Sequence, residues 1–162
     1  MSSRVTVFCE DSYGPRFLRN LVAWLKSIGL IDNSVGLDCL MFYHPCNPKL
    51  ENQLLAKSGL SSRFVVLVDT DGHPKLEVEN RVRQHIPQSF RDITRLVIFD
   101  YEIEDWICVG LGIQITGKTY EIMKKEFYYE KFRLPSYATK LDINKLKTCK
   151  SFMDFLESFS DL

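Results

Sequence analysis

The sequence predicts an α/β protein with a mostly parallel four-stranded sheet, helices on both faces and a small helical extension after the sheet. Four short runs rich in β-branched and aromatic residues alternate with segments whose apolar residues recur every three or four positions. This alternation is typical of a parallel sheet, because parallel strands need a crossover that is usually a helix. Such crossovers are right-handed, so few topologies remain to be considered.

In the first half of the chain, short apolar runs predict two strands and helical spacing predicts two helices. Val5, Val7 and Phe8 belong to a buried run that a polar turn ends after Cys9. Apolar residues at spacings of three and four then predict an amphipathic helix that begins near Gly14. The elements expected here are strands at 4–9 and 37–43 and helices at 14–28 and 48–57, which glycines at 29 and 59 close.

In the second half, the run 64–68 is apolar at every position, which is typical of a central parallel strand buried on both faces. Pro74 begins a polar helix after it. The elements expected here are strands at 64–68 and 95–99 and helices at 74–85, 101–111, 120–132, 142–147 and 152–159. We expect one domain over residues 1–162, with a core at about 1–112 and a helical extension at about 119–162.

Composition excludes several classes of protein. The 21 basic and 21 acidic residues cancel, so the chain lacks the overall positive field that holds nucleic acid through many phosphate contacts. The five cysteines are odd in number and show no CxxC spacing, which argues against a disulfide framework and a zinc site. There is no signal-peptide pattern and no apolar run of membrane-spanning length. We therefore expect a soluble cytoplasmic protein with no membrane partner.

Carboxylates follow three of the four predicted strands. Glu10 follows the first strand, Asp69 and Asp71 follow the third, and Glu102 with Glu104 follows the fourth. The carboxyl ends of parallel strands meet at one edge of the sheet, where ligands bind. Oxygen ligands of this kind suit Mg2+ or Mn2+, and alternate residues of an extended segment face the same way. The pattern predicts a metal site for chemistry on phosphates, with Glu10 as a metal ligand or general base.

The same residues also have an ordinary structural interpretation. The sequence 69–72 is a common turn, and the acidic segment 10–12 is a good helix start. Their occurrence at equivalent ends of two strands favours the site. Of the three histidines, His73 alone is next to this acidic cluster in the sequence. It is a candidate for proton transfer, although an exposed loop histidine would look the same.

These segments bear a resemblance to a known family. The stretches 7–18 and 66–72 resemble the Toprim domain of topoisomerases, bacterial-type primases and the overcoming-lysogenization-defect nucleases. Those proteins use a Glu after the first strand and a DxD motif after a later strand for Mg2+-dependent chemistry on nucleic acid phosphodiesters. The stretches 101–106 and 141–156 are similar to small stand-alone Toprim-like proteins. The resemblance covers nearly the whole chain.

The resemblance implies a nuclease-type activity in which Glu10, Asp69 and Asp71 bind the metal and carry catalysis. Glu102 or Glu104 would supply a further acidic group at the same edge.

The chain departs from the family pattern at one position. Related nucleases often have another acid four residues after the first Glu, whereas this chain has Gly14 there and has Asp11 next to Glu10. This departure and the zero net charge favour the alternative of a non-catalytic Toprim-like binding or adaptor protein. Its partner would be a protein or a nucleic acid.

A second motif points to a different chemistry. Residues 112–119 match the phosphate-binding pattern GxxxxGK[ST], with Lys118 and Thr119 at its end. However, no later apolar strand ends in Asp to supply the second magnesium ligand, and the loop is rich in β-branched residues. We therefore expect no nucleotide cofactor and interpret Thr119 as a helix cap, while an NTPase remains a third possibility.

The predicted helix 120–132 combines aromatic and basic residues. Such a surface stacks bases and holds phosphates in some proteins. At helical spacing, aromatic residues more often cover a core while lysines face the solvent, so we expect core packing here. The residues concerned are Phe127, Tyr128, Tyr129 and Phe132, with Lys124, Lys125, Lys131 and Arg133.

Overall fold

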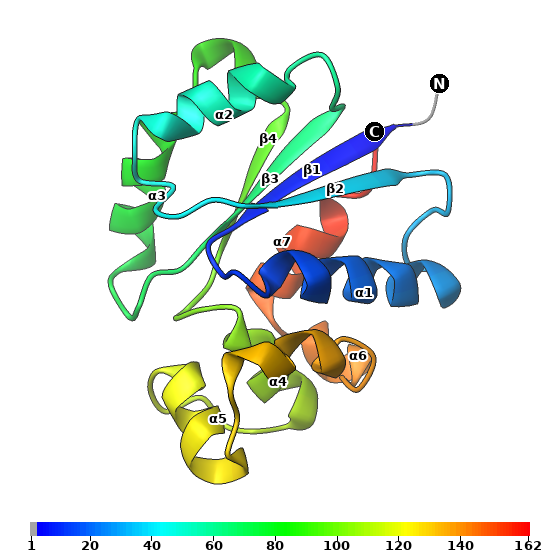
Figure 1. Cartoon of the computed structure of the whole chain (residues 1–162), viewed down its shortest axis with the longest axis vertical. Coiled ribbons are helices and arrows are strands. Elements are labelled where there is room, and N and C mark those ends of the chain that lie inside the picture. Colours follow the sequence, from blue (N-terminus) through cyan, green and yellow to red (C-terminus); the bar gives the residue numbers. More distant parts are fainter. Residues whose placement is uncertain (1–2) are drawn as a thin grey trace.

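A computed structural model of the chain describes residues 3–162 and has a four-stranded, all-parallel sheet (Figure 1). The strands lie in the order β2-β1-β3-β4, so β1 and β3 are central. The predicted α/β class is therefore confirmed. The strands are β1 (Arg4–Cys9), β2 (Gly36–Met41), β3 (Arg63–Val68) and β4 (Thr94–Ile98).

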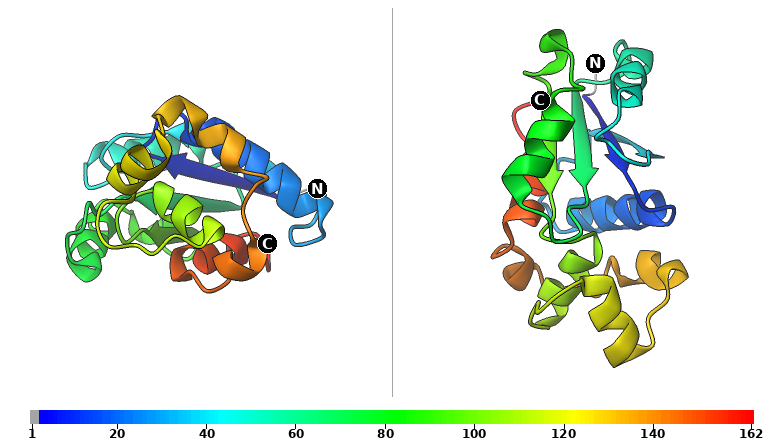
Figure 2. Two further views of the ribbon diagram at one scale, coloured as in Figure 1. Left: turned by 90° about the horizontal axis from the view of Figure 1, so that it is seen from below. Right: turned by 90° about the vertical axis from the view of Figure 1, so that its left-hand side faces the viewer.

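Helices cover both faces of the sheet (Figures 1 and 2). Helices α2 and α3 pack on one face, and α1 and α7 pack on the other. Helices α4, α5 and α6 lie beyond one end of the strands, at the bottom of Figure 1. The helices are α1 (Gly14–Ser27), α2 (Lys49–Lys57), α3 (Lys75–Arg83), α4 (Glu104–Leu111), α5 (Thr119–Phe127), α6 (Ile143–Leu146) and α7 (Lys150–Glu157), with 3-10 turns at Gln88–Phe90 and Lys131–Tyr137.

The central strand β3 is apolar at consecutive positions because successive side chains enter different cores. Val65 and Leu67 belong to the core beneath α1 and α7, whereas Phe64, Val66 and Val68 belong to the core beneath α2 and α3. All five side chains are buried. The prediction of a strand buried on both faces is confirmed.

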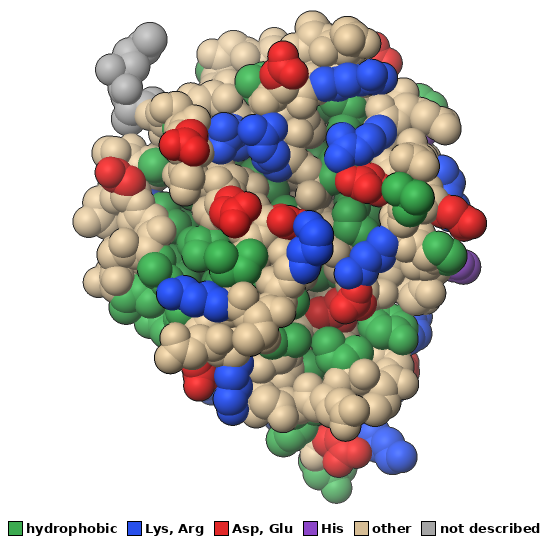
Figure 3. Space-filling model, turned by 180° about the vertical axis from the view of Figure 1, so that it is seen from behind, with side chains coloured by type: hydrophobic (Ala, Val, Ile, Leu, Met, Phe, Trp, Pro, Cys, Tyr) green, Lys and Arg blue, Asp and Glu red, His purple; other side chains and the backbone are tan. Residues whose placement is uncertain are grey.

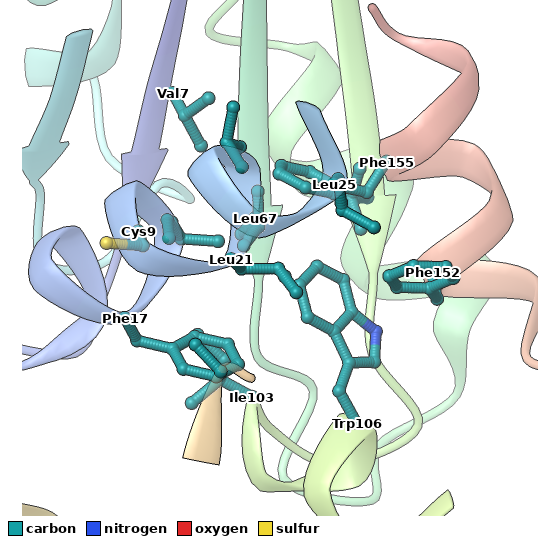
Figure 4. Packing of buried hydrophobic residues seen from close by; sticks show 14 of the residues in the cluster. Val7, Cys9, Phe17, Leu21, Leu25, Leu67, Ile103, Trp106, Phe152 and Phe155 are labelled. Carbon is teal, nitrogen blue, oxygen red and sulfur yellow. The ribbon is translucent and has the colours of Figure 1, made fainter. Parts of the chain in front are cut away.

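Trp106 links the helical extension to the sheet (Figure 4). This side chain of α4 is fully buried and packs edge-to-face against Phe99, with ring centroids 5.1 Å apart, and against Phe152, at 5.6 Å. The indole Nε1–H donates a hydrogen bond of 2.9 Å to Ser151 Oγ, so the polar atom of Trp106 is satisfied. The extension and the sheet thus share one hydrophobic core.

The aromatic segment differs from its prediction. Helix α5 ends at Phe127 because Tyr128 adopts a left-handed conformation (φ 53°), and a 3-10 turn with Pro135 inside it follows. The helical spacing from which burial of the aromatic residues was predicted therefore does not continue beyond Phe127. Tyr129 alone of the four aromatic residues is buried, whereas Tyr128 is 85% exposed and Phe127 and Phe132 are about half exposed. Core packing was the wrong expectation for these three.

The other predicted elements occur within a few residues of their expected bounds. On the face shown in Figure 3, basic and acidic side chains are interspersed, in keeping with the zero net charge of the chain. Among residues 3–162, no helix is both long enough and apolar enough to cross a bilayer.

We predict that Trp106→Ala lowers the free energy of unfolding by about 3–5 kcal/mol, because it leaves a large cavity where the extension meets the sheet. Urea unfolding followed by far-UV circular dichroism measures this change. Trp24→Ala is the matched control, since Trp24 is only partly buried at the margin of the same core. Equal losses for the two variants would contradict the central role of Trp106.

Candidate functional site

The carboxyl ends of β1 and β3 open into one cavity of about 350 Å3. These two strands are neighbours in the centre of the sheet and run in the same direction, so the residues after them meet at one edge. The three acidic residues predicted to form the site all line this cavity. Its lining consists of Glu10, Asp11, Ser12, Tyr43, His44, Asp69, Asp71 and Lys131.

Glu10 and Asp69 are in direct contact across the two strands. The backbone N–H of Asp69 donates a hydrogen bond of 2.7 Å to Oε2 of Glu10. Burial raises the pKa of Glu10, and the backbone N–H groups of Asp69 and His44 oppose part of this shift. The hydrogen bond therefore holds the Glu10 carboxyl group at the end of β3 and opposes the upward shift of its pKa.

The Asp69 carboxyl group is buried among other carboxyl groups and, among the described residues, has no nearby positive charge to pair with. Burial, followed by the nearby carboxylates of Glu10 and Glu104, raises the pKa of Asp69 to about 9. Among residues 3–162, no Lys or Arg forms an ion pair with it. At neutral pH and without a cation, Asp69 is therefore protonated.

Asp71 lies in the turn that the structural interpretation of residues 69–72 predicted. The segment after β3 is a turn rather than an extended tail, because Asp71 and Gly72 both have positive φ, at 51° and 86°. Asp69 and Asp71 therefore do not face the same way as alternate residues of an extended strand would, although both line the same cavity. The Asp71 carboxylate lies 3.7 Å from the ammonium group of Lys118.

Asp11 and Glu104 are bridged by one lysine. The Lys131 ammonium group lies 2.8 Å from Oδ2 of Asp11 and forms a second ion pair with Oε1 of Glu104. Glu104 is fully buried, and its Oε2 has no hydrogen-bond partner. Burial raises the pKa of Glu104 to about 7, against the opposing effect of Lys131. Burial also lowers the pKa of Lys131, but Glu104 and Asp11 together outweigh this effect and raise it.

Neither Glu102 nor Glu104 lines the cavity, and Glu102 binds the start of α5. Its Oε2 accepts a hydrogen bond of 3.2 Å from the backbone N–H of Tyr120, at the start of α5. The neighbouring Asp105 accepts the Thr119 hydroxyl at 2.7 Å and the backbone N–H of Tyr101 at 2.9 Å. Glu104, not Glu102, is thus the acid of this pair that approaches the site, through Lys131.

The segment 112–119 lacks the surroundings of a phosphate-binding loop. It follows helix α4, whereas a phosphate-binding loop follows a strand. The Thr119 hydroxyl is buried against Asp105, and the Lys118 ammonium group lies near Asp71. The prediction that Thr119 caps this helix is wrong, because Lys118 occupies the cap position without a capping hydrogen bond from its side chain, and Thr119 is the first residue of α5.

The histidine at the cavity is His44 and not His73. The His73 side chain is exposed and does not line the cavity, and its backbone N–H bonds to the Thr70 carbonyl at 2.9 Å. His44 and Tyr43 come from the loop after β2, the strand beside β1. Sequence reasoning had a usable signal for them, because they follow a third parallel strand at the same edge of the sheet.

Close packing against Cys9 explains why residue 14 is a glycine. A Cβ atom at this position would lie 2.7 Å from Sγ of Cys9, which is closer than real side chains approach. An acid at residue 14 is therefore incompatible with Cys9 as it is packed here, and Asp11 is the acid that lines the cavity beside Glu10.

Among residues 3–162, no group of three His, Cys, Asp or Glu side chains is placed to hold a metal ion. Two of the carboxylates that line the cavity have lysine partners, since Asp71 is paired with Lys118 and Asp11 with Lys131. Glu10 and Asp69 have no basic partner among the described ion pairs. Two carboxyl groups that line one open cavity fit Mg2+, which takes one or two protein carboxylates and keeps several waters.

Comparison with protein-family models finds no match for this chain, and comparison with curated proteins finds none either.

The raised pKa of Asp69 predicts a specific pH dependence of stability without metal. The Asp69 carboxyl is protonated up to about pH 9 in the folded protein, whereas in the unfolded chain it ionises near 3.8, the usual pKa of an aspartate. The folded state then binds more protons between these values, so stability falls as the pH rises. We expect wild-type protein in EDTA to lose stability relative to Asp69→Asn between about pH 5 and about pH 8.

Denaturant unfolding at several pH values tests this expectation. Asp92→Asn is the control, because Asp92 is an exposed aspartate in the loop before β4. It should keep the wild-type pH profile. Parallel profiles for wild type and Asp69→Asn would show that the Asp69 carboxyl is not perturbed.

Proposed function

We propose that the protein carries out Mg2+- or Mn2+-dependent phosphodiester chemistry on nucleic acid, of the nuclease type, in the cavity at the ends of β1 and β3. The observation that carries this proposal is that Glu10, bound by the backbone N–H of Asp69, and the Asp69 carboxyl group line one cavity at the central edge of a parallel sheet, and neither carboxyl group has a basic partner among the described ion pairs. A divalent cation would supply the missing positive charge. The resemblance to the Toprim domain supports the same choice of residues.

In this mechanism Glu10 and Asp69 would hold the cation, and Asp71 would join them after leaving Lys118. The bound cation would polarise a phosphoryl oxygen and lower the pKa of a bound water. In the alternative role of general base, Glu10 would take a proton from an attacking water, and burial, which raises its pKa, would favour this role. Lys131 lines the same cavity and contributes a fixed positive charge beside the phosphate.

The surface near the cavity supports nucleic acid as the substrate class. Three aromatic side chains are exposed in the segment next to Lys131, and the Arg133 guanidinium group lies 5.8 Å from the centre of the Phe132 ring. Aromatic and guanidinium planes of this kind stack on unpaired bases. We place the activity in the cytoplasm, where the five free cysteines would stay reduced.

The second candidate function is a non-catalytic Toprim-like adaptor that binds a protein or a nucleic acid. One observation favours it: Lys118 and Lys131 already neutralise Asp71 and Asp11, two of the carboxylates in the cavity. An adaptor of this kind needs no metal for its stability or its binding.

A divalent-ion titration separates the two functions. We expect wild-type protein to bind Mg2+ and Mn2+ saturably in calorimetry and to cleave single- or double-stranded oligonucleotides only when the ion is present. Asp69→Asn and Glu10→Gln should lose ion binding, and the activity should fall by at least about 100-fold, as when a principal electrostatic group is removed. The Gln amide oxygen can still accept the Asp69 N–H, so Glu10→Gln tests charge rather than folding.

Asp92→Asn is again the matched control and should bind the ion as wild type does. Saturable ion binding without cleavage of any oligonucleotide would argue against the nuclease. Absence of ion binding in the wild type would favour the adaptor.

We predict that the exposed aromatic residues contribute to binding of single-stranded nucleic acid. Replacing Tyr128 and Phe132 together by Ala should weaken binding by about 1–3 kcal/mol for each base that loses its stacking partner. Fluorescence anisotropy with labelled single-stranded oligonucleotides measures this effect. The control is Leu76→Ala, an exposed apolar residue on α3. Unchanged affinity in the aromatic variant would remove these residues from the substrate surface.

A further inference from the structure

Lys131 lies between two carboxylates that come from distant parts of the chain. Asp11 belongs to the loop between β1 and α1, Glu104 to the first turn of α4, and Lys131 to the 3-10 turn after α5. The ammonium group is 2.8 Å from Oδ2 of Asp11 and pairs with Oε1 of Glu104. One compact cation therefore bridges two acids, as a metal ion does in a carboxylate site.

Two features distinguish this arrangement from a surface ion pair. The Glu104 side chain is fully buried, and the Asp11 side chain is 9% exposed. The Glu104 carboxylate also keeps one buried oxygen, Oε2, without any hydrogen-bond partner. Two acids face a single positive charge, so the bridge retains an excess negative charge and an unused oxygen ligand.

We propose that Asp11 and Glu104 form a cation site that the Lys131 ammonium group fills in place of a divalent ion. This inference depends on the proposed function in one respect only, which is the neighbouring divalent ion that Glu10 and Asp69 would hold. The protein then binds one divalent ion, and Lys131, which lines the same cavity, acts as a second, fixed positive charge.

Charge and size support this assignment. A lysine ammonium group is a compact, strongly hydrated charge with three donors, and Asp11 and Glu104 use two of them. Removing it would leave two buried carboxylates with no counter-charge, which is strongly destabilising unless another cation enters. The Glu104 carboxylate can contribute to such a site, because its buried Oε2 has no hydrogen-bond partner.

The test is the stoichiometry of Mn2+ binding, measured by electron paramagnetic resonance on the full chain. We expect about one equivalent of Mn2+ for wild type and about two for Lys131→Met, because oxygen ligands released by the lysine suit a hard divalent ion. Methionine keeps the length of the apolar stem but carries no charge. The double variant Lys131→Met with Glu104→Gln should return to about one equivalent, since one anionic ligand is then missing.

Lys150→Met is the matched control. Lys150 also pairs with a carboxylate, that of Asp154 at 2.7 Å, but on the exposed surface of α7. It should bind the same amount of Mn2+ as wild type. If Lys131→Met does not fold in EDTA, recovery of its near-UV circular dichroism on adding Mn2+ supports the proposal, and failure to recover overturns it.

The outcomes separate this inference from the proposed function. Wild type that binds no Mn2+, with a new Mn2+ site in Lys131→Met, would support the lysine-filled site and refute the metal at Glu10 and Asp69. Two equivalents in wild type would overturn the inference and leave the metal-dependent function standing. Equal stoichiometry in wild type and Lys131→Met overturns the inference in every case.

Discussion

The hydrogen bond from the Asp69 backbone to the Glu10 carboxylate is the contact on which the candidate site depends. It joins the ends of two central strands, and it does so only because β1 and β3 are adjacent, parallel and in register. The backbone amide stabilises an ionised Glu10 without supplying a counter-charge, so the neighbouring Asp69 carboxyl is left in an acidic, partly desolvated environment. The fold thus gathers negatively charged groups, without enough positive charge to balance them, at the carboxyl ends of its two central strands.

Two lysines from outside the sheet neutralise part of this negative charge. Lys118 and Lys131 come from the segment after α4, and each pairs with an acid that lines the cavity. Their positions depend on the packing of the extension, which Trp106 anchors in the shared core. The helical extension therefore contributes to the chemistry of the site as well as to its structure. It supplies the lysines, whereas the loops that follow the strands supply the carboxyl groups.

Local signals in the sequence predicted most of the fold and the acids of the site. The all-apolar run of β3 predicted a central strand, and the carboxylates after β1 and β3 predicted a shared edge. The aromatic segment was predicted incorrectly, because the left-handed turn at Tyr128 ends the helix and no residue there signals it. His44 was overlooked although it also comes after a strand, and Lys131 was noted only as part of the aromatic and basic segment, with no signal that it lines this cavity.

The sequence by itself determined the α/β class, the element order and the candidates Glu10, Asp69 and Asp71, because these depend on periodicity and on the residue types at the end of each strand. Only the tertiary structure decided which acids meet a cation, since Lys131 lies more than a hundred residues from Asp11 along the chain yet pairs with it. It also showed that Cys9 requires Gly14. Ion pairs and close contacts between distant segments depend on packing in three dimensions, and a local pattern of residue types carries no record of it.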